Sequence, residues 1–422
     1  MSSLNLQRNS EVFFSTVDLA NGGAPTSMTP TNTWKLEVLA GFAASSSAAT
    51  QDITSLESGT SPDRSQQRFN TAINPVDWNF QVYMRPTGAV TGAAENTGSA
   101  GASASGNVKP VADWFMWQSL VSNTRVADGT EENSVWEDGG KLRTVTTTAG
   151  TGSHASRSNF STAVENHMYF KLDNVIYQVS NATVNQATVD AGIEEIATST
   201  WTGFGTTMKE LTGTPRDVAV SVFGGILNSG SSVLANANAY TYTAAASYHP
   251  YNQANVAGSV ATNSFIKNRL SAIEFHHKPS AGGTDVKYTF PVTALSFDYN
   301  NNITYLTPEE LANLNEPIGQ FTGTRAVTGS ATMYLRAGDN ESAQFLRNIA
   351  NDSRTSSAQT SNANLIIGGA TAPYVAFQLD AVQFAFPQLA VEDVISMSVN
   401  FVAQEPAASK GDGGEVTIFA AK

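Results

Sequence analysis

Cysteine is absent from this chain of 422 residues, and charged residues are scarce. Without cysteine there is no disulfide, no thiol nucleophile and no Cys-ligated metal. Lys, Arg, Asp and Glu make up 14% of the chain, against roughly 25% in a typical soluble domain. Hydrophobic residues make up 41%, so small neutral residues fill the difference. Such a composition is typical of proteins that bury much of their exterior against copies of themselves, because interface charges must be paired or desolvated.

Basic charge and long apolar runs are also lacking. The net charge is −13, from 36 acidic and 23 basic residues. Tight nucleic-acid binding depends on Lys and Arg at the phosphates, so it is disfavoured, whereas passage of DNA without adhesion is compatible with this charge. No stretch approaches the ~18 apolar residues of a membrane span, and residues 1–14 contain no apolar run of signal-peptide length. We expect a chain made in the cytoplasm, without membrane insertion.

Catalytic and metal sites are disfavoured by the few histidines. His276 and His277 are adjacent, so in a strand they point to opposite faces and cannot share a metal; we expect surface histidines. No G-x-S-x-G motif is present, and His154, His167 and His249 lie in polar or low-complexity contexts, which disfavours a hydrolytic triad. The sequence therefore predicts no enzyme, no catalytic residue, no cofactor and no metal.

Alternation of apolar and polar residues dominates what is present. In "WNFQVYMR", residues 78–85, every second residue is apolar, as in a strand with one dry and one wet face. "GSATMYLR", residues 329–336, has the same phase, with Tyr and Arg at matching places. Short amphipathic helices are predicted after each strand, at 111–120 and 341–350.

Two further segments complete the parallel. Residues 177–196 correspond to 377–394, and each is followed by a short alternating segment ending near 202 or 401. The order strand, helix, strand, strand therefore recurs. We predict a mainly β protein of two tandem β-sandwich domains, each with a short flanking α-helix. The predicted domains are 1–205, with a flexible insertion at 87–110, and 264–422; residues 206–263 form a connector with a candidate hairpin.

Five stretches resemble a known family. They are "LQRNSEVFFSTV" (6–17), "RFNTAINPVDWNFQVYMRP" (68–86), "NNNITYLTPEEL" (300–311), "EPIGQFTGTRAVTGSATMYL" (316–335) and "VEDVISMSVNF" (391–401). In this order they are similar to the tail tube proteins of long-tailed bacteriophages, in the duplicated siphophage version. The resemblance implies trimeric, pseudo-six-fold rings that stack into a hollow conduit for viral DNA during ejection. It also implies a virion tail location, a tape measure inside the tube, and tail-tip and terminator proteins at its ends.

Strand arithmetic agrees with oligomerisation. If each half gives ~4 strands to an inner wall, one chain gives ~8, which side chains would fill, whereas three chains give ~24 and leave a channel. Head-to-tail contacts whose rotation closes would form the ring. We propose candidate lumen-facing residues at the paired closing strands and their entries; the carboxylates among them are as easily ordinary loop residues. These candidates are Glu194, Glu195, Thr198, Thr200, Glu392, Asp393, Ser396 and Ser398.

Three alternatives remain open from sequence. Another self-assembling β-rich surface or fibre protein would need a secretion signal, which residues 1–14 lack. A sugar-binding β-sandwich module or hydrolase would need an exposed aromatic platform. Trp114, Phe115 and Trp117 are candidates for such a platform, although their helical spacing favours the core. A contractile-tail tube protein would have the same fold, because its sheath is a separate chain.

Overall fold

The computed structural model describes residues 10–16, 18, 33–53, 67–85, 113–121, 134–137, 141–144, 165–172, 175–210, 220–221, 225–226, 266–278, 286–307, 316–355, 360–369, 374–391, 394–404 and 415–421. Antiparallel β-strands dominate this part of the chain, so the mainly β prediction is confirmed. The predicted insertion at 87–110 lies outside the described residues. None of the described helices has the length and apolar character needed to cross a membrane.

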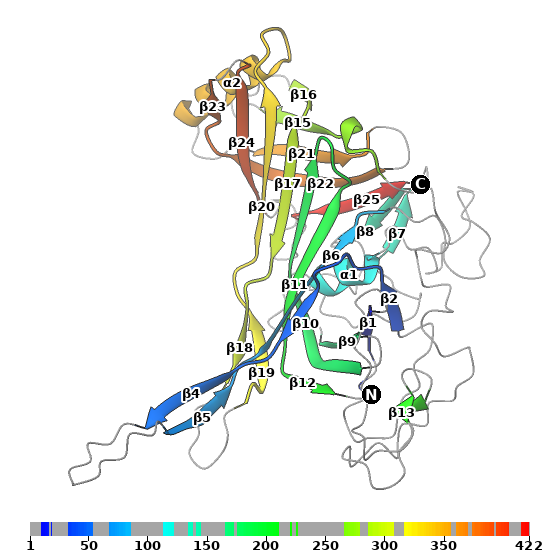
Figure 1. Cartoon of the computed structure of the whole chain (residues 1–422). Helices are drawn as coiled ribbons and strands as arrows, with labels where there is room; N and C mark the ends of the chain where they lie inside the picture. The colour runs from blue at the N-terminus through cyan, green and yellow to red at the C-terminus, as the bar shows by residue number, and fades with distance from the viewer. Residues whose placement is uncertain are drawn as a thin grey trace.

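One antiparallel sheet runs through both halves of the sequence, and we call it the wall sheet (Figure 1). Counting β22 and β23 as one strand, it has eight strands. Their order is β3 (Ala43–Ser45), β6 (Val76–Tyr83), β11 (Thr198–Gly205), β10 (Val175–Gly192), β17 (Ala294–Asn300), β20 (Ala326–Tyr334), β24 (Ser396–Ala403), and β22 (Tyr374–Phe384) with β23 (Gln388–Ala390).

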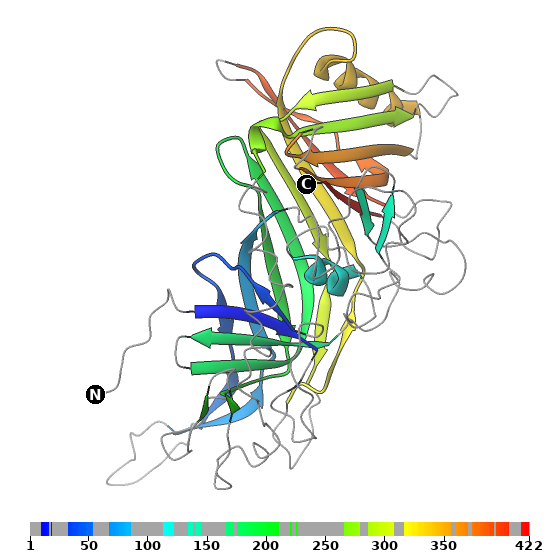
Figure 2. The same ribbon diagram turned by 90° about the vertical axis from the view of Figure 1, so that its right-hand side faces the viewer.

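Two outer sheets lie across the wall sheet (Figure 2). The first is built from the first half of the sequence, whereas the second combines strands of the second half with β7 and β8 of the first. The first has the order β2 (Thr33–Leu36), β1 (Ser10–Ser15), β9 (Asn166–Leu172), the start of β10, and β12 (Thr207–Glu210). The second has the order β16 (Val286–Pro291), β15 (Ala272–Lys278), β21 (Thr360–Ile367), the start of β22, β25 (Thr417–Ala421), β8 (Lys141–Thr144) and β7 (Ser134–Glu137). β10 and β22 each leave an outer sheet to enter the wall.

The remaining elements are three hairpins, two α-helices and a 3-10 turn. The hairpins are β4 (Ala48–Ile53) with β5 (Gln67–Ile73), β18 (Ile303–Leu306) with β19 (Gly319–Thr322), and β13 (Val220–Ser221) with β14 (Gly225–Ile226). The helices are α1 (Trp114–Val121), α2 (Ser342–Thr355) and the 3-10 turn η6 (Asn268–Leu270). β13 and β14 lie within the predicted connector, whose boundaries stay a prediction.

The same pairing plan occurs in each half of the chain. β6 pairs with β3 on one side and with the closing strand β11 on the other, and β20 pairs with β17 and the closing strand β24 in matching register. In each half, a large aromatic residue on one strand faces a glycine on the other, but the two strands exchange these roles between the halves. Trp78 on β6 faces Gly203 on β11, whereas Gly329 on β20 faces Phe401 on β24. A Cβ on Gly329 would lie 2.2 Å from the Phe401 ring, so these positions require glycine.

The core lies between the apolar face of the wall sheet and the outer sheets. The apolar residues of "WNFQVYMR" all face it, as alternation predicts: Trp78, Phe80, Val82 and Met84 are buried. Phe115 and Trp117 of α1 are each 1% exposed, so they belong to the core and offer no sugar platform. His277 is also buried, with its ring near the Ser361 hydroxyl, so the expectation of a surface position was wrong for this residue.

A buried carboxyl group precedes α1. Oδ2 of Asp113 accepts a hydrogen bond from Nε1 of Trp201 on β11, at 3.0 Å. Its Oδ1 has no hydrogen-bond partner among the described residues. Burial raises the pKa of Asp113 to about 6, although the Trp201 hydrogen bond and the nearby Arg85 charge oppose the rise. At neutral pH the ionised Asp113 carboxylate therefore lowers the stability of the folded state.

This pKa predicts a pH dependence of stability. Between about pH 4 and pH 6 the folded state keeps a proton at Asp113 that the unfolded state releases. The stabilisation of the folded state by this bound proton is present below about pH 4 and is lost as the pH rises through about 6. We expect Asp113→Asn to increase the free energy of unfolding at pH 7 by on the order of 1–3 kcal/mol. The substitution should also remove the decrease in stability as the pH rises from about 4 to about 7. Thermal unfolding from pH 4 to pH 7 measures it, with the exposed Asp339→Asn as control. Parallel pH profiles for Asp113→Asn and the unsubstituted chain would contradict the assignment.

Candidate functional site

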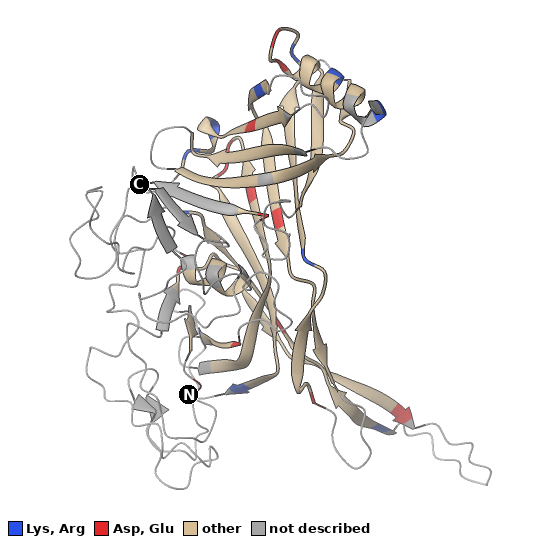
Figure 3. Cartoon of the chain, turned by 180° about the vertical axis from the view of Figure 1, so that it is seen from behind, with Lys and Arg blue, Asp and Glu red and all other residues tan. Residues whose placement is uncertain are grey.

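The face of the wall sheet that points away from the core is polar and carries no basic residue. No Lys or Arg, the residues drawn in blue in Figure 3, occurs in the wall strands. Strand register places Asp77, Asp190 and Asp298 on this face. The other members are neutral, and most are small and polar. They include Asn79, Gln81, Gln186, Thr188, Thr198, Thr200, Thr202, Ser296, Asn300, Thr328, Ser330, Thr332, Ser396, Ser398, Asn400 and Gln388. Four larger residues, Tyr83, Phe204, Tyr334 and Val402, lie on the same face. We call this surface the polar face.

Four of the predicted site residues lie on the polar face. Thr198 and Thr200 on β11, and Ser396 and Ser398 on β24, are half-buried among their neighbours. The Thr200 hydroxyl accepts a hydrogen bond of 2.9 Å from Nε2 of Gln81 on the adjacent strand. Alternation therefore brought these residues onto one surface. That they face a channel stays a prediction.

The predicted carboxylates lie elsewhere or outside the described part. Glu194 and Glu195 are exposed in the turn that joins β10 to β11, at the end of the wall sheet. Glu194 lies 3.4 Å from Arg269, and both side chains are largely exposed, so this ion pair contributes little. Glu392 and Asp393 are not among the described residues. The acidic groups of the polar face are instead Asp77, Asp190 and Asp298, which the sequence analysis missed.

The two halves meet where β10 pairs with β17, over seven residue pairs from Gln186 opposite Asn300 to Gly192 opposite Ala294. Asp298 accepts hydrogen bonds of 2.7 Å from Nε2 of Gln186 and from Oγ1 of Thr188. We call this contact the internal junction. This contact joins the wall strands of the two halves into one continuous sheet.

Side chains beneath the polar face also cross the internal junction. Nδ2 of Asn301, which is 3% exposed, donates a hydrogen bond of 2.6 Å to the Leu120 carbonyl at the end of α1. The Trp117 ring lies 5.5 Å from Phe377 of β22 and 4.8 Å from Trp201 of β11, centroid to centroid. The junction is therefore packed as a protein interior, and the two halves form one body.

The wall sheet ends in two open edges. The outer edge of β3 has no partner among the strands that the structure describes, and neither has the outer edge formed by Gln383, Phe384 and β23. Val382, just before this second edge, still pairs with Ser361 of β21. Open edges present backbone N–H and C=O groups that can pair with another chain. Large apolar side chains are exposed beside one of them: Phe386 is 65% exposed, Leu389 48% and Val391 78%.

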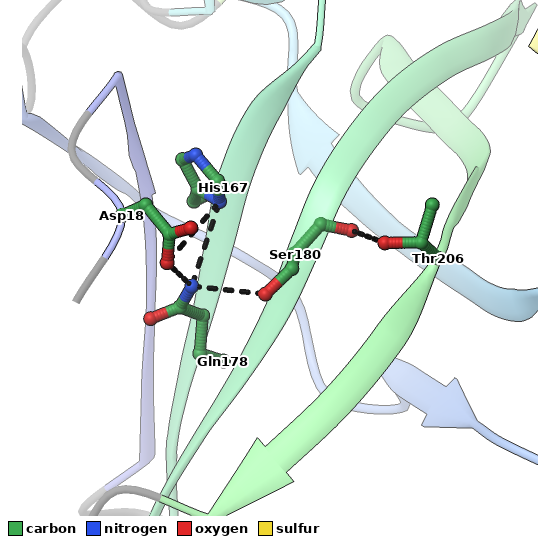
Figure 4. A network of polar contacts seen from close by, with 5 residues as sticks. All are labelled: Asp18, His167, Gln178, Ser180 and Thr206. Carbon is green, nitrogen blue, oxygen red and sulfur yellow. Dashed lines mark hydrogen bonds and ion pairs between the residues drawn. The ribbon is translucent and has the colours of Figure 1, made fainter. Parts of the chain in front are cut away.

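One buried polar network brings Ser, His and Asp together, which allows the hydrolase alternative to be examined (Figure 4). Nδ1 of His167 lies 4.0 Å from Asp18, and Nε2 of Gln178 donates to Asp18 and to the Ser180 hydroxyl. A triad needs its nucleophile within hydrogen-bond reach of the base, but the Ser180 hydroxyl is bonded to Gln178 instead. The network lies where β10 leaves the outer sheet, and Thr206 binds the Ser180 carbonyl there. Its geometry favours a structural role at this bend.

Comparison with known proteins shows similarity along nearly the whole chain to one tail protein. The chain is 26% identical over 424 residues to the tail tube protein pb6 of Escherichia phage T5, covering 98% of this chain and 75% of that protein. This confirms the resemblance inferred from the five sequence stretches. No protein-family model matches the chain.

Two solved structures show a weaker likeness. One is the baseplate of the anti-feeding prophage, with 13% identity over 32% of this chain and 89% of that chain, at a TM-score of 0.23. The other is the SPP1 tail tube, with 15% identity over 37% of this chain and 80% of that chain, also at 0.23. At these scores the superposition supports no inference, so the assignment rests on the sequence match.

The internal junction predicts a stability effect. Asp298→Ala removes the acceptor of two hydrogen bonds across β10 and β17, so we expect a loss of about 1–3 kcal/mol in the free energy of unfolding. Asp77→Ala is the matched control, because Asp77 is exposed on the same face; we expect a change within about 0.5 kcal/mol. Urea unfolding followed by tryptophan fluorescence measures both. Equal effects would show that Asp298 does not hold the junction.

Proposed function

We propose that this chain is a structural tail tube subunit, three copies of which close edge to edge into a ring whose polar face lines a channel for viral DNA. Stacked rings would form the tube. The observation that carries the proposal is the wall sheet itself, which is continuous through both halves, polar on one face and open at both edges. A closed barrel would leave no such edges.

The number of strands requires several copies. One chain supplies eight wall strands, and a barrel of that size is filled by its own side chains. Three copies supply about 24, more than the 16–18 that already hold an aqueous channel in porins. With strands about 4.8 Å apart and tilted by roughly 40°, such a wall would be about 45–50 Å across at the backbone. That width leaves an open lumen once side chains are added.

The chemistry of the polar face suits passage of DNA. A duplex binds where Lys and Arg neutralise its phosphates, and the wall strands contain neither. Asp77, Asp190 and Asp298 would repel the phosphates through like charge. The hydroxyl and amide groups around them keep the surface hydrated, with no basic group that would hold the phosphates. The lumen therefore acts as a non-adhesive lining, and the subunit performs no catalysis.

Contacts between rings would involve the β4–β5 and β18–β19 hairpins, which extend from the same end of the molecule (Figure 1). The β18–β19 hairpin and its approach expose Leu306, Ile318 and Phe321, and β5 exposes Phe69. Exposed apolar groups gathered on projecting elements are typical of interaction sites. β5 pairs with β4 in the other hairpin, so strands would make this contact.

The subunit would be made in the host cytoplasm and assembled into the virion tail. Its partners would be further copies of itself, a tape measure protein inside the lumen, and the tail-tip and terminator proteins at the ends. Viral DNA would pass through without specific binding. The similarity to pb6 supports the tail assignment; these partners extend it.

The assembly proposal is tested by electron microscopy of the purified chain over a range of protein concentrations, with and without a tail-tip seed. We expect hollow tubes, or rings with three-fold symmetry, and light scattering that gives multiples of three chains. A solid fibre or a flat lattice would favour the surface-protein alternative. Persistent monomers under both conditions would count against the tube.

The lining proposal predicts a charge effect. We expect tubes of Asp77→Lys/Asp190→Lys to retain short duplex DNA at low ionic strength and to release it steeply as salt rises, whereas unsubstituted tubes retain little. Glu316→Lys/Asp339→Lys makes the same charge change at exposed residues outside the wall strands and is the control. Equal retention by the two variants would show that the polar face does not line the path of DNA.

A further inference from the structure

The internal junction provides a template for the contact between chains, because the pairing plan of the two halves can be aligned residue by residue. Tyr83 faces Thr198 in the first half, and Tyr334 faces Ser396 in the second. Thr198 therefore corresponds to Ser396, and Thr200 to Ser398. The alignment uses only strand register and extends outward to the strands on either side.

The open edges occupy the same places as the two strands of the internal junction. Thr188 faces Thr200 and Gln388 faces Ser398, so β23 corresponds to the end of β10. On the other side, Ala43 faces Asn79 as Ser296 faces Ser330, so β3 corresponds to β17. β10 already pairs with β17, whereas β23 and β3 lie at opposite ends of the wall sheet and cannot meet within one chain.

We propose that β23 of one copy pairs with β3 of a second copy in the register of the internal junction. The internal pairs Thr188–Asp298, Val189–Phe297 and Asp190–Ser296 translate into pairs between chains. They place Gln388 opposite Ser45, Leu389 opposite Ala44, and Ala390 opposite Ala43. This contact, which we call the seam, rests on the proposed ring and specifies how that ring closes.

Side-chain size supports this register. The internal junction places Val189 opposite the larger Phe297. In the seam the larger residue would be on the other strand of the pair: Leu389 of β23 would lie opposite the small Ala44 of β3. Leu389 is 48% exposed in the single chain, so burial against a second copy would remove apolar surface from water.

The seam has fewer backbone pairs than the internal junction. Pro387 corresponds to Ala187, which pairs with strands on both sides, but proline has no N–H to donate. On the other edge a turn at Gly41, with φ of +100°, precedes β3. β3 and β23 each have three residues, against seven pairs in the junction. Short, interrupted edges resist pairing in isolation, so a single seam is weak and the closed ring holds three together.

Paired cysteines test the register, because the chain has no other thiol. Gln388→Cys and Ser45→Cys are combined in one chain, and assembled tubes are oxidised with copper phenanthroline. Both sites are exposed, and circular dichroism checks folding. We expect non-reducing gels to show dimers and a terminal trimer that a reductant returns to monomer. The control Gln388→Cys/Ser47→Cys places its second thiol on the same face two residues along; we expect at least about ten-fold less cross-linking.

The outcomes separate the seam from the proposed function. Tubes without cross-links in the first variant, or stronger cross-linking in the control, would overturn the seam while leaving the tube intact. If the first variant does not assemble alone, it is mixed with excess unsubstituted chain. Assembly of that mixture without cross-linked dimer would also overturn the seam. Failure of the unsubstituted chain to form tubes or rings would overturn the proposed function, and the seam with it.

Discussion

Backbone hydrogen bonding at the edges of the wall sheet is the constraint on which the rest of the structure depends. Every inner strand of that sheet has partners on both sides, and the two outermost strands do not. A repeated fold meets this requirement once within the chain, at the internal junction, where the covalent link keeps the second half at high effective concentration. In the proposed ring the remaining pair of edges is met by other copies, so duplication would halve the number of chains that the ring requires.

The alternation of side chains assigns a separate task to each face of this sheet. Apolar residues of the wall pack against the outer sheets, where Trp78 in one half and Phe401 in the other fill equivalent space from opposite strands. The polar face is left with hydroxyls, amides and three carboxylates, and with no basic residue. The low charge of the whole chain agrees with the proposed contacts between copies, since residues buried in such contacts must avoid unpaired charge.

Local patterns allowed the strands, the helices and the common face of four candidate residues to be predicted, because period-two alternation depends only on neighbours in sequence. Thr198, Thr200, Ser396 and Ser398 were found in this way. Glu194 and Glu195 were assigned to the face because they adjoin a strand, but they occupy a turn. Asp190 and Asp298 were missed because their role arises from the pairing of β10 with β17, over a hundred residues apart. Strand order, and hence the open edges, is fixed by such distant contacts.

The central claim is that one chain provides eight strands of a continuous wall whose polar face encloses a lumen. A cryo-electron microscopy reconstruction of the assembled protein tests it most directly. If three chains close the wall, the reconstruction will show an unbroken inner barrel of about 24 strands, with Asp77, Asp190 and Asp298 facing the lumen. A wall with gaps between chains, or a lumen lined by the outer sheets, would contradict it.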